Sequence, residues 1–350
     1  MTHPLHDPLI LEPPPTVEPA ALLGLLAEAY GLEGSLHPLG GERDRNFRFA
    51  KREGGNLLIR VTHWAEDPAV TDFQTQALLH LEAADPGLPN PRVIPTLSGA
   101  ADVPHDFGGK TCRVRLLSWA EGEALAGSNL SPGWQSRLGA LVARMDLGFR
   151  GFSHPAQNRR LLWDLQEAAS LRDFVADIPD AGHRALATRA LEYFAEEVSP
   201  RLAGLRPQVI HNDLNPHNVV VDPADPTRIV GVIDFGDIVH APLVQEVGTA
   251  CAYLLTEEAE PLAGPAGFLA GYTQALPLTA EEIALIPGLI MTRMAMTLTI
   301  TGFRSKLQPE NATYILRNAP RAARGLSTLA GREMDEMVAF LAAACRSADA

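Results

Sequence analysis

Two short polar segments near the middle of the chain constrain its fold more than any other feature. The first reads HNDLNPHNVVVD from residue 211 and places His211, Asp213 and Asn218 at fixed intervals. The second reads GVIDFGD from residue 231 and contains Asp234. Each segment adjoins an apolar run, and the stretch DPADPTR between the runs has the composition of a turn. We therefore predict a β-hairpin with Asn218 before its first strand and Asp234 at the end of its second, so that the two side chains converge.

The residue types at these positions suit one kind of chemistry. A carboxylate such as Asp213 can orient a hydroxyl group and take its proton late in a group transfer. Asn218 and Asp234 offer oxygen ligands, which Mg²⁺ prefers and which suit zinc or copper poorly. His211 can take part in the reaction, although we favour a packed support of the loop. Each segment alone could be an ordinary turn and strand, but the two together indicate a site for phosphoryl transfer.

Composition narrows the class of protein. The chain has 350 residues, 46% of them hydrophobic, which is enough for one or two globular domains. Its net charge of −13 argues against a nucleic-acid or anionic-membrane partner and favours a small amine as substrate. The stretch 289–303 is apolar but is too short for a membrane span and contains Arg293. Cys112, Cys251 and Cys345 have no metal-ligand spacing and are odd in number, so we expect free thiols and a cytoplasmic protein.

Periodicity divides the chain into a short tail and two lobes. Residues 1–16 have no periodic pattern, and we expect a loose tail there. We predict a small mixed β-sheet lobe over 17–118, with helices at 17–30 and 68–83 and strands at 34–39, 45–50, 56–62, 92–96 and 111–119. A larger, mainly helical lobe should occupy 119–350, with helices at 134–145, 160–176, 182–198 and 243–276 and further helices after them. The fold class is therefore α+β. The basic cluster Arg317, Arg321 and Arg324 is expected to be a solvated helix face.

The motifs together resemble a known superfamily. Besides the two central segments, these are GGERDRNFRF at 40–49, DFQTQALLHL at 72–81, VRLLSWAEGEAL at 114–125 and LLWDLQEAASLRDF at 161–174. Over residues 17–345 the chain looks like the aminoglycoside phosphotransferase and choline kinase superfamily, closest to the hydroxylysine kinases and to the kinase-like domains of bacterial aminotransferase fusions. The resemblance implies the two-lobe fold of the protein kinases, with ATP or GTP as phosphoryl donor.

The resemblance also assigns the nucleotide-binding residues. Gly40, Gly41 and Asn46 would belong to a turn that covers the phosphates, although a plain hairpin turn explains the glycines equally well. The segment between the lobes, whose backbone would pair with the nucleotide base, contains Ser118, Trp119 and Glu121.

One position departs from the superfamily pattern. The third strand normally carries a lysine that pairs with the nucleotide phosphates, held by a glutamate from the following helix; this chain has Arg60 and Gln74 instead. Arginine keeps the charge and adds a planar fork of donors, but it is bulkier than lysine. We expect Arg60 to bind phosphate and Gln74 to be a structural support, since an uncharged Gln74 does not require a lysine as its partner.

Further positions belong, by resemblance, to the acceptor site and its supports. Trp163 and Asp164 would wall the acceptor site, and Asp237 follows the metal-binding aspartate. These could contact an acceptor ammonium through carboxylates or a ring face, with core packing as the alternative for Trp163. Glu246 matches an acidic position that braces the catalytic loop.

The sequence thus predicts a small-molecule kinase that phosphorylates a hydroxyl group on a small amine or amino acid. Hydroxylysine is the first choice of acceptor, and homoserine, choline-like and aminoglycoside acceptors remain open. Arg60 motivates one alternative of another class, a catalytically silent protein that binds a nucleotide or a partner. The intact Asp213, Asn218 and Asp234 argue against that alternative. Oligomeric state does not follow from the sequence.

Overall fold

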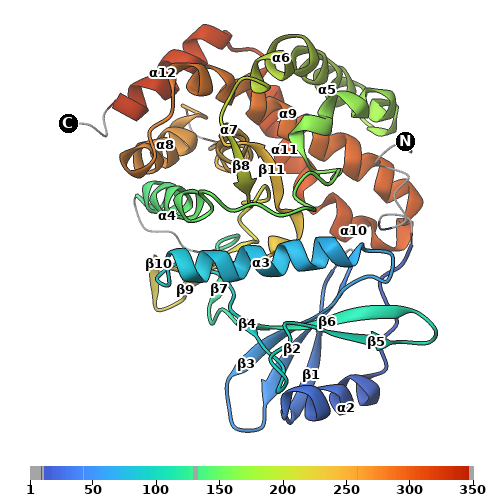
Figure 1. Ribbon diagram of the computed structural model, residues 1–350. Helices are drawn as coiled ribbons and strands as arrows, with labels where there is room; N and C mark the ends of the chain where they lie inside the picture. Colours follow the sequence, from blue (N-terminus) through green and yellow to red (C-terminus); the bar gives the residue numbers. More distant parts are fainter. Residues whose placement is uncertain (1–8, 10–11, 42, 129–132, 258, 347–350) are drawn as a thin grey trace.

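The computed structural model describes residues 9, 12–41, 43–128, 133–257 and 259–346. The chain forms two lobes, a small one built on a sheet and a larger one built mainly of helices (Figure 1). The predicted two-lobe α+β fold is confirmed. Most of the predicted loose tail lies outside the described residues, but Pro15 accepts a hydrogen bond from Arg45 Nε at 3.2 Å, and Glu12 lies 3.7 Å from Lys110 Nζ. The described end of the tail therefore packs against the small lobe.

The small lobe consists of one sheet and two helices. Its elements are α2 (Pro19–Tyr30), β1 (Gly34–Leu39), β2 (Arg45–Lys51), β3 (Asn56–Val61), α3 (Pro68–Ala84), β4 (Val93–Ile94), β5 (Val103–Asp106) and β6 (Thr111–Ser118). The strand order is β1-β2-β3-β6-β4, with β5 beside β6. All these pairings are antiparallel, so the sheet is not mixed as we expected. The sequence VPHD of β5 was missed because proline and aspartate are depleted in strands.

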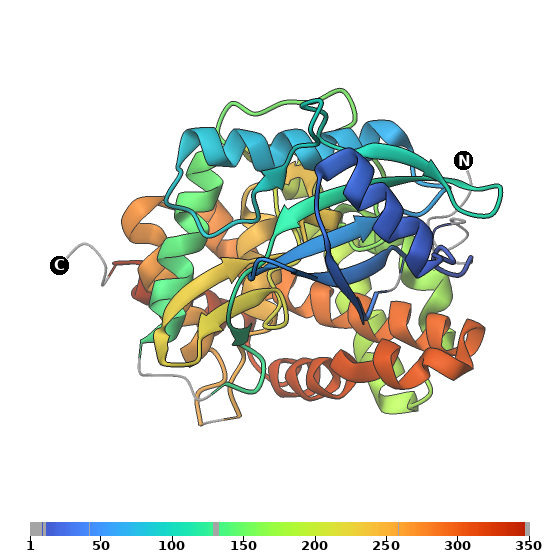
Figure 2. The ribbon, with the colours of Figure 1, turned by 90° about the horizontal axis from the view of Figure 1, so that it is seen from below.

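Helix α2 gives the small lobe a core of its own. It lies across one face of the sheet (Figure 2), and the fully buried Leu22 and Leu26 pack in one cluster with Phe49 of β2 and Ile59 of β3. The helix ends, as predicted, at Gly31, whose φ of 68° is accessible to glycine at little cost. This packing fixes which face of the sheet is left for the other lobe.

Strand alternation then orients β3 toward the large lobe. Leu57, Ile59 and Val61 are buried in the small-lobe core, whereas Leu58 packs against the core of the large lobe. Because successive side chains of a strand point to opposite faces, Arg60 lies on the same side as Leu58. The sequence position of Arg60 is thus sufficient to direct it between the lobes.

The large lobe contains the remaining elements. Its helices are α4 (Trp134–Gly148), α5 (Ala181–Tyr193), α6 (Ser199–Leu202), α7 (Val244–Ala252), α8 (Ala263–Ala275), α9 (Ala280–Leu307), α10 (Ala312–Ile315), α11 (Ala319–Leu329) and α12 (Met334–Arg346). The 3₁₀ segments are Leu165–Asp177, Phe235–Asp237, Pro309–Asn311 and Leu316–Asn318, and Phe194–Val198 is a π-helical turn. The predicted single helical stretch over 243–276 is wrong, because α7 and α8 are separate helices. The predicted helix at 160–176 is a 3₁₀ helix.

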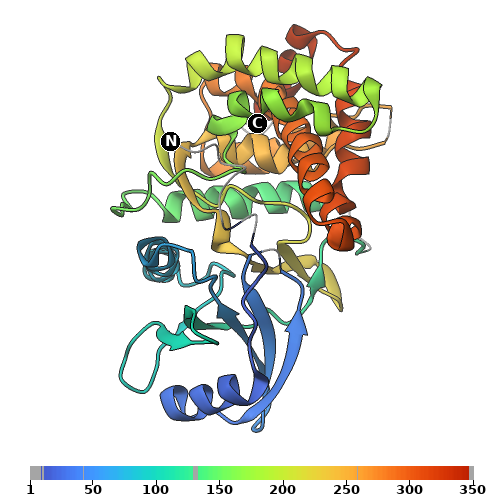
Figure 3. The same ribbon diagram turned by 90° about the vertical axis from the view of Figure 1, so that its right-hand side faces the viewer.

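Five short strands of the large lobe surround the central motifs. They are β7 (Glu123–Ala124), β8 (Pro207–Ile210), β9 (Val219–Asp222), β10 (Asp225–Val232) and β11 (Val239–Pro242). β9 and β10 form the predicted antiparallel hairpin, and β7 pairs with β9. The predicted lobe boundary after residue 118 falls between β6, in the small-lobe sheet, and β7, in the large-lobe sheet. Figure 3 shows the two lobes on either side of this junction.

Helix α9 is the central helix of the large lobe. It begins with a capping box, in which Thr279 and Glu282 bond to each other's backbone N–H groups, and runs for 28 residues. By length and composition it could cross a membrane, but 94% of its most apolar window is buried inside the protein. Such burial is typical of a core helix, and it places the polar residues of α9 where they can reach the site.

Candidate active site

The predicted catalytic loop connects β8 to β9 and is held in a rare backbone conformation. Among the described residues other than glycine, only Asn212 (φ 67°) and Asp234 (φ 64°) have a positive φ. Asparagine and aspartate adopt this left-handed conformation at lower cost than most residues. The Asn212 N–H donates to Glu246 Oε2 at 2.9 Å, and Gln245 Nε2 donates to Asn212 Oδ1 at 3.1 Å. Buried side chains of α7 therefore fix the conformation of the loop.

His211 and Glu246 occupy supporting positions. His211 is fully buried, its Nε2 lies 3.0 Å from the Ile233 carbonyl, and its ring meets Phe235 edge-on. Because a carbonyl only accepts, Nε2 carries the proton. Burial raises the pKa of Glu246, whose carboxyl group is completely enclosed. His211 thus links the two motifs, and Glu246 fixes the catalytic loop to α7.

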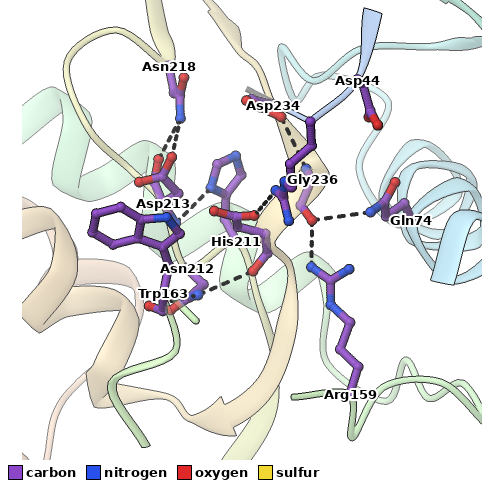
Figure 4. Close-up of polar contacts among 12 residues, drawn as sticks. Asp44, Gln74, Arg159, Trp163, His211, Asn212, Asp213, Asn218, Asp234 and Gly236 are labelled. Carbon is purple, nitrogen blue, oxygen red and sulfur yellow. Dashed lines mark hydrogen bonds and ion pairs between the residues drawn. The ribbon is translucent and has the colours of Figure 1, made fainter. Parts of the chain in front are cut away.

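Asp213 is the carboxylate that the loop presents to the cavity. Its Oδ2 accepts from Asn218 Nδ2 at 2.8 Å (Figure 4). Oδ2 also accepts from Asn215 Nδ2 at 3.0 Å, and Oδ1 accepts from Arg293 at 2.8 Å. The side chain keeps 19% of its surface exposed. It is therefore oriented by three donors while remaining accessible to an acceptor hydroxyl.

The environment of Asp213 adjusts its proton affinity. The pKa of Asp213 is raised to about 7. Burial is the largest cause, the Arg293 guanidinium opposes it, and the charges of Asp237 and Asp234 add to it. A carboxylate with a pKa near neutrality can take a proton and release it again at physiological pH. This is the property required of a general base.

Asn218 and Asp234 present oxygen atoms suited to a divalent cation. The Asn218 amide nitrogen is committed to the backbone and side-chain oxygens of Asp213, and its carbonyl oxygen points away from them (Figure 4). Asp234 has 52% of its side chain exposed and uses Oδ1 to accept from Arg60 and from the Gly236 N–H. The described residues hold no group of three or more His, Cys, Asp or Glu side chains that could bind a metal alone. The oxygen donors of Asn218 and Asp234 fit a divalent cation that takes phosphates and water as its other ligands.

Arg60 reaches the site, but the expected helix residue does not hold it. Arg60 Nη1 lies 3.0 Å from Asp234 Oδ1, and Nε forms an ion pair with Asp44, which also accepts the His63 N–H at 3.0 Å. Gln74 instead accepts from the buried Arg115 at 2.7 Å and donates to the Gly236 carbonyl at 3.2 Å. Gln74 thus has structural contacts with Arg115 and the Gly236 backbone. The residue that holds Arg60 is Asp44, from the turn between β1 and β2.

The glycine-rich turn lies over the same space. A Cβ atom on Gly41 would come within 2.6 Å of the Asp44 carbonyl oxygen, so the turn requires glycine there. Asn46 is paired with Arg60 in the β2–β3 register, and its buried Oδ1 has no hydrogen-bond partner. Gly40 and Gly41 line the cavity together with these residues. Residue 42 lies outside the described residues.

The two carboxylates proposed as ammonium contacts, Asp164 and Asp237, already have partners within the protein. Asp164 is 4% exposed, begins the 3₁₀ helix by accepting the Gln166 N–H, and accepts Gln245 Nε2 at 2.8 Å. These hydrogen bonds give Asp164 the position of a buried structural cap, and burial raises its pKa. Asp237 lines the cavity, but it forms an ion pair with Arg43 that lowers its pKa.

Trp163 lines the cavity, but the guanidinium group of Arg293 already lies over its ring face. The Arg293 guanidinium lies 4.9 Å from the ring centroid and donates to the Trp163 carbonyl at 2.8 Å. An acceptor ammonium would have to approach another part of the ring.

The segment between the lobes lies outside the cavity. Ser118 Oγ accepts the Arg92 N–H at 2.8 Å, and Glu121 accepts Asn56 Nδ2 at 2.8 Å. Ser118, Trp119 and Glu121 are absent from the described lining of the cavity, which has a volume of about 230 Å³. The structure thus places these three residues at the junction and leaves a contact with a nucleotide base as a prediction.

Sequence reasoning missed several residues of the site. Arg293 contacts Asp213 from α9, Arg43 pairs with Asp237, and Arg159 donates to the Gly236 carbonyl. Arg317, expected on a solvated face, lines the cavity. Of these residues, only Arg293 could have been found from the sequence. It lies in an apolar stretch, and an arginine buried in an apolar helix needs a polar partner.

Comparison with known proteins decides the family. A model of the phosphotransferase enzyme family matches residues 35–282, which is more than half of the chain. The chain belongs to this family. It is therefore a phosphotransferase, with an alcohol group as acceptor, and the resemblance seen in the sequence is confirmed.

Relatives of this phosphotransferase extend over almost its whole length. It is 28% identical to a hydroxylysine kinase of Danio rerio over 339 residues, which cover 93% of this chain and 95% of the relative. It is 26% identical to a hydroxylysine kinase of Mus musculus, with 90% of each chain covered.

Solved structures share the fold. A microcompartment-associated aminopropanol kinase matches with a TM-score of 0.71 at 22% identity, over 89% of this chain and 99% of the other. An amicoumacin kinase in complex with AMP-PNP and Ca²⁺ matches with a TM-score of 0.69 at 14% identity, over 91% and 97%. At these identities the likeness establishes the fold.

Proposed function

We propose that this phosphotransferase transfers the γ-phosphoryl group of ATP or GTP to the hydroxyl group of a small amine or amino acid, with hydroxylysine as the first choice. The observation that carries this proposal is Asp213, which is oriented by Asn218 and Arg293 beside Asp234 at the cavity. Its proton affinity suits a base, and the match to hydroxylysine kinases over 93% of the chain supports the acceptor. Homoserine, choline-like and aminoglycoside acceptors are the other candidates.

The residues divide the work as follows. Asp213 orients the acceptor hydroxyl and receives its proton through the oxygen exposed to the cavity. Arg60 and the turn containing Gly40 and Gly41 hold the phosphates by charge and by backbone N–H groups. These contacts position the donor and acceptor, which is the main contribution a protein makes to this reaction.

Asn218 and Asp234 would hold Mg²⁺. When bound, the ion would neutralise charge on the phosphate oxygens. Two protein oxygens fit an ion that usually keeps several waters and substrate phosphates as ligands.

Arg60 favours activity over the silent alternative. A silent protein would have no need to direct this side chain at the metal-binding motif, yet Arg60 contacts Asp234 at 3.0 Å. We further propose a cytoplasmic protein, supported by its three free cysteines, two of them buried. The net charge of −13 supports small-molecule substrates over nucleic acid or a membrane surface.

A substrate panel tests the proposal. Hydroxylysine, homoserine, choline and an aminoglycoside are each incubated with ATP or GTP and Mg²⁺, and both nucleoside diphosphate release and product mass are measured. We expect phosphorylated hydroxylysine at the highest kcat/KM. Omission of Mg²⁺ is the control for metal dependence, and release of diphosphate without a phosphorylated product would contradict the proposal.

A further inference from the structure

Arg115 is a buried cation whose hydrogen-bond partners among the described residues are all neutral. It lies on β6 directly opposite Arg60 of β3, so the two side chains share the face of the sheet that points away from α2. Only 2% of Arg115 is exposed, and burial lowers its pKa to about 10, which leaves it charged at neutral pH. Its partners all belong to α3; they are the Thr71 carbonyl and Thr75 Oγ1, each at 3.2 Å, and Gln74 Oε1 at 2.7 Å. Arg115 therefore fixes α3 against the sheet.

Gln74 connects this cation to the segment that contains Asp234. Its Oε1 accepts from Arg115 Nη2, and its Nε2 donates to the Gly236 carbonyl at 3.2 Å (Figure 4). Because an arginine only donates and a carbonyl only accepts, these two partners fix which end of the amide is which. Gln74 is 4% exposed, so water does not compete for either end. The amide thus forms a bridge with a defined direction.

The Gly236 carbonyl is held from both lobes. Gln74 donates to it from α3 of the small lobe. Arg159, in the large-lobe segment between α4 and the 3₁₀ helix Leu165–Asp177, donates to the same oxygen through Nη2 at 2.5 Å (Figure 4). A carbonyl oxygen has two lone pairs, and these two donors use both. The Gly236 peptide is therefore clamped between the lobes.

This peptide lies directly against Asp234 and Arg60. The Gly236 N–H donates to Asp234 Oδ1 at 3.3 Å. A Cβ atom at position 236 would lie 2.7 Å from Arg60 Nη2 and 2.9 Å from Asp234 Oδ1, so the close approach requires glycine. Asp234 itself has a φ of 64°, a conformation that persists only where the surroundings hold it. A shift of the Gly236 peptide would therefore move Asp234 as well.

We infer that Gln74 is a positioning residue for phosphoryl transfer, which relays the fixed position of Arg115 to the Gly236 peptide and thereby to Asp234. This role rests on the proposed function, in which Asp234 holds the metal. It also requires an amide in place of the glutamate that the superfamily pattern has at this position. A glutamate would keep the contact with Arg115, but its second oxygen would face the Gly236 carbonyl with no proton between them.

The two ends of Gln74 lead to opposite expectations for stability and for activity. In Gln74→Glu the buried Arg115 gains a charged partner, so the stability of the protein should not fall, whereas the Gly236 contact is replaced by repulsion. In Gln74→Leu the shortest hydrogen bond of Arg115 is lost, and stability should fall. If Gln74 only stabilised the lobe, activity would follow stability across these variants.

Steady-state kinetics test the bridge. We measure kcat, KM for ATP at saturating Mg²⁺, KM for Mg²⁺ and the thermal midpoint, with the best acceptor of the panel. Gln74→Glu should lower kcat about 10-fold and raise KM for Mg²⁺ by a similar factor, with KM for ATP and the thermal midpoint close to those of wild type. Gln76→Glu is the matched control, since Gln76 is exposed on the same helix and donates to Asp72. Wild-type kcat in Gln74→Glu would overturn the inference.

A double variant separates the bridge from the lysine–glutamate pair of the superfamily. Arg60→Lys combined with Gln74→Glu restores that pair. We expect kcat of the double variant to be about 10-fold below that of Arg60→Lys alone, because the Gly236 contact is still lost. A higher kcat in the double variant than in Arg60→Lys would show that position 74 serves the β3 cation, and would overturn the inference.

Amide hydrogen exchange provides a readout that needs no acceptor. The segment Phe235–Asp237 should exchange faster in Gln74→Glu than in wild type, although the protein is no less stable. Unchanged exchange in this segment would overturn the inference and leave the proposed function standing. No transfer by wild type to any acceptor of the panel would instead reject the proposed function, and the exchange rates would still decide whether Gln74 holds this segment.

Discussion

Arg293 donates to Asp213 across a distance of 2.8 Å, with only 2% of the arginine side chain exposed. The two residues are 80 positions apart in the sequence, and the contact joins the central helix α9 to the catalytic loop. Arg293 stabilises the ionised form of Asp213, while burial favours the protonated form more strongly. The balance between these two effects sets the pH at which the base is available.

The pH dependence of the reaction should report this balance. Asp213 accepts a proton only when ionised, so kcat/KM should fall as the pH drops below about 7, the pKa of Asp213. Arg293→Met removes a charge that lowers this pKa and should shift the acidic limb to higher pH. A pH–rate profile of both proteins measures the shift, with Arg324→Ala as the control. An unchanged limb in Arg293→Met would show that another group controls it.

Asp213→Asn should remove most of the turnover. The amide cannot take the hydroxyl proton, so kcat should fall by about 100-fold or more, while nucleotide affinity changes little. Asp234→Asn should behave differently, because it weakens a ligand to the metal and should reduce Mg²⁺-dependent nucleotide binding as well as the rate. Calorimetric titration with a non-hydrolysable nucleotide separates the two effects. Near-normal turnover in Asp213→Asn would remove its assignment as the base.

Arg60→Ala should lower kcat/KM, because the phosphate charge would lose its partner as the transition state forms. The expected loss of transition-state stabilisation is about 2–4 kcal/mol. Arg60→Lys should keep measurable activity. Asp44→Asn should impair nucleotide binding, since Asp44 holds the Arg60 side chain, whereas Gln74→Leu should leave the nucleotide KM close to that of wild type. The nucleotide KM of the four variants provides the comparison. A larger effect in Gln74→Leu than in Asp44→Asn would reverse our assignment.

Glu246→Ala should destabilise the protein. It leaves the buried N–H of Asn212 without an acceptor, in a loop whose φ of 67° depends on its contacts. We expect a loss of about 1–3 kcal/mol in the free energy of unfolding. Denaturant unfolding measures this loss. Glu246→Gln keeps an acceptor oxygen and should lose less, so equal losses in the two variants would contradict the role given to this hydrogen bond.

The sequence alone determined those parts of the site whose geometry depends on residues close to one another in the chain. Asn218 and Asp234 lie at the two ends of one hairpin, and hairpin geometry follows from two apolar runs around a turn. Asp213 lies in the loop that leads into the hairpin. The alternation of β3 likewise directs Arg60 between the lobes without further information.

Only the tertiary structure decided which distant side chains complete the site. The ion pairs of Arg60 with Asp44, Arg43 with Asp237 and Arg293 with Asp213 join separate elements of the chain. Asp164 shows why the sequence alone was not sufficient. From its place in the sequence, Asp164 could be either a substrate contact or a structural residue. Only the folded structure showed that its carboxylate already accepts hydrogen bonds from Gln166 and Gln245. Charges select partners by distance and burial, and neither is encoded in local spacing.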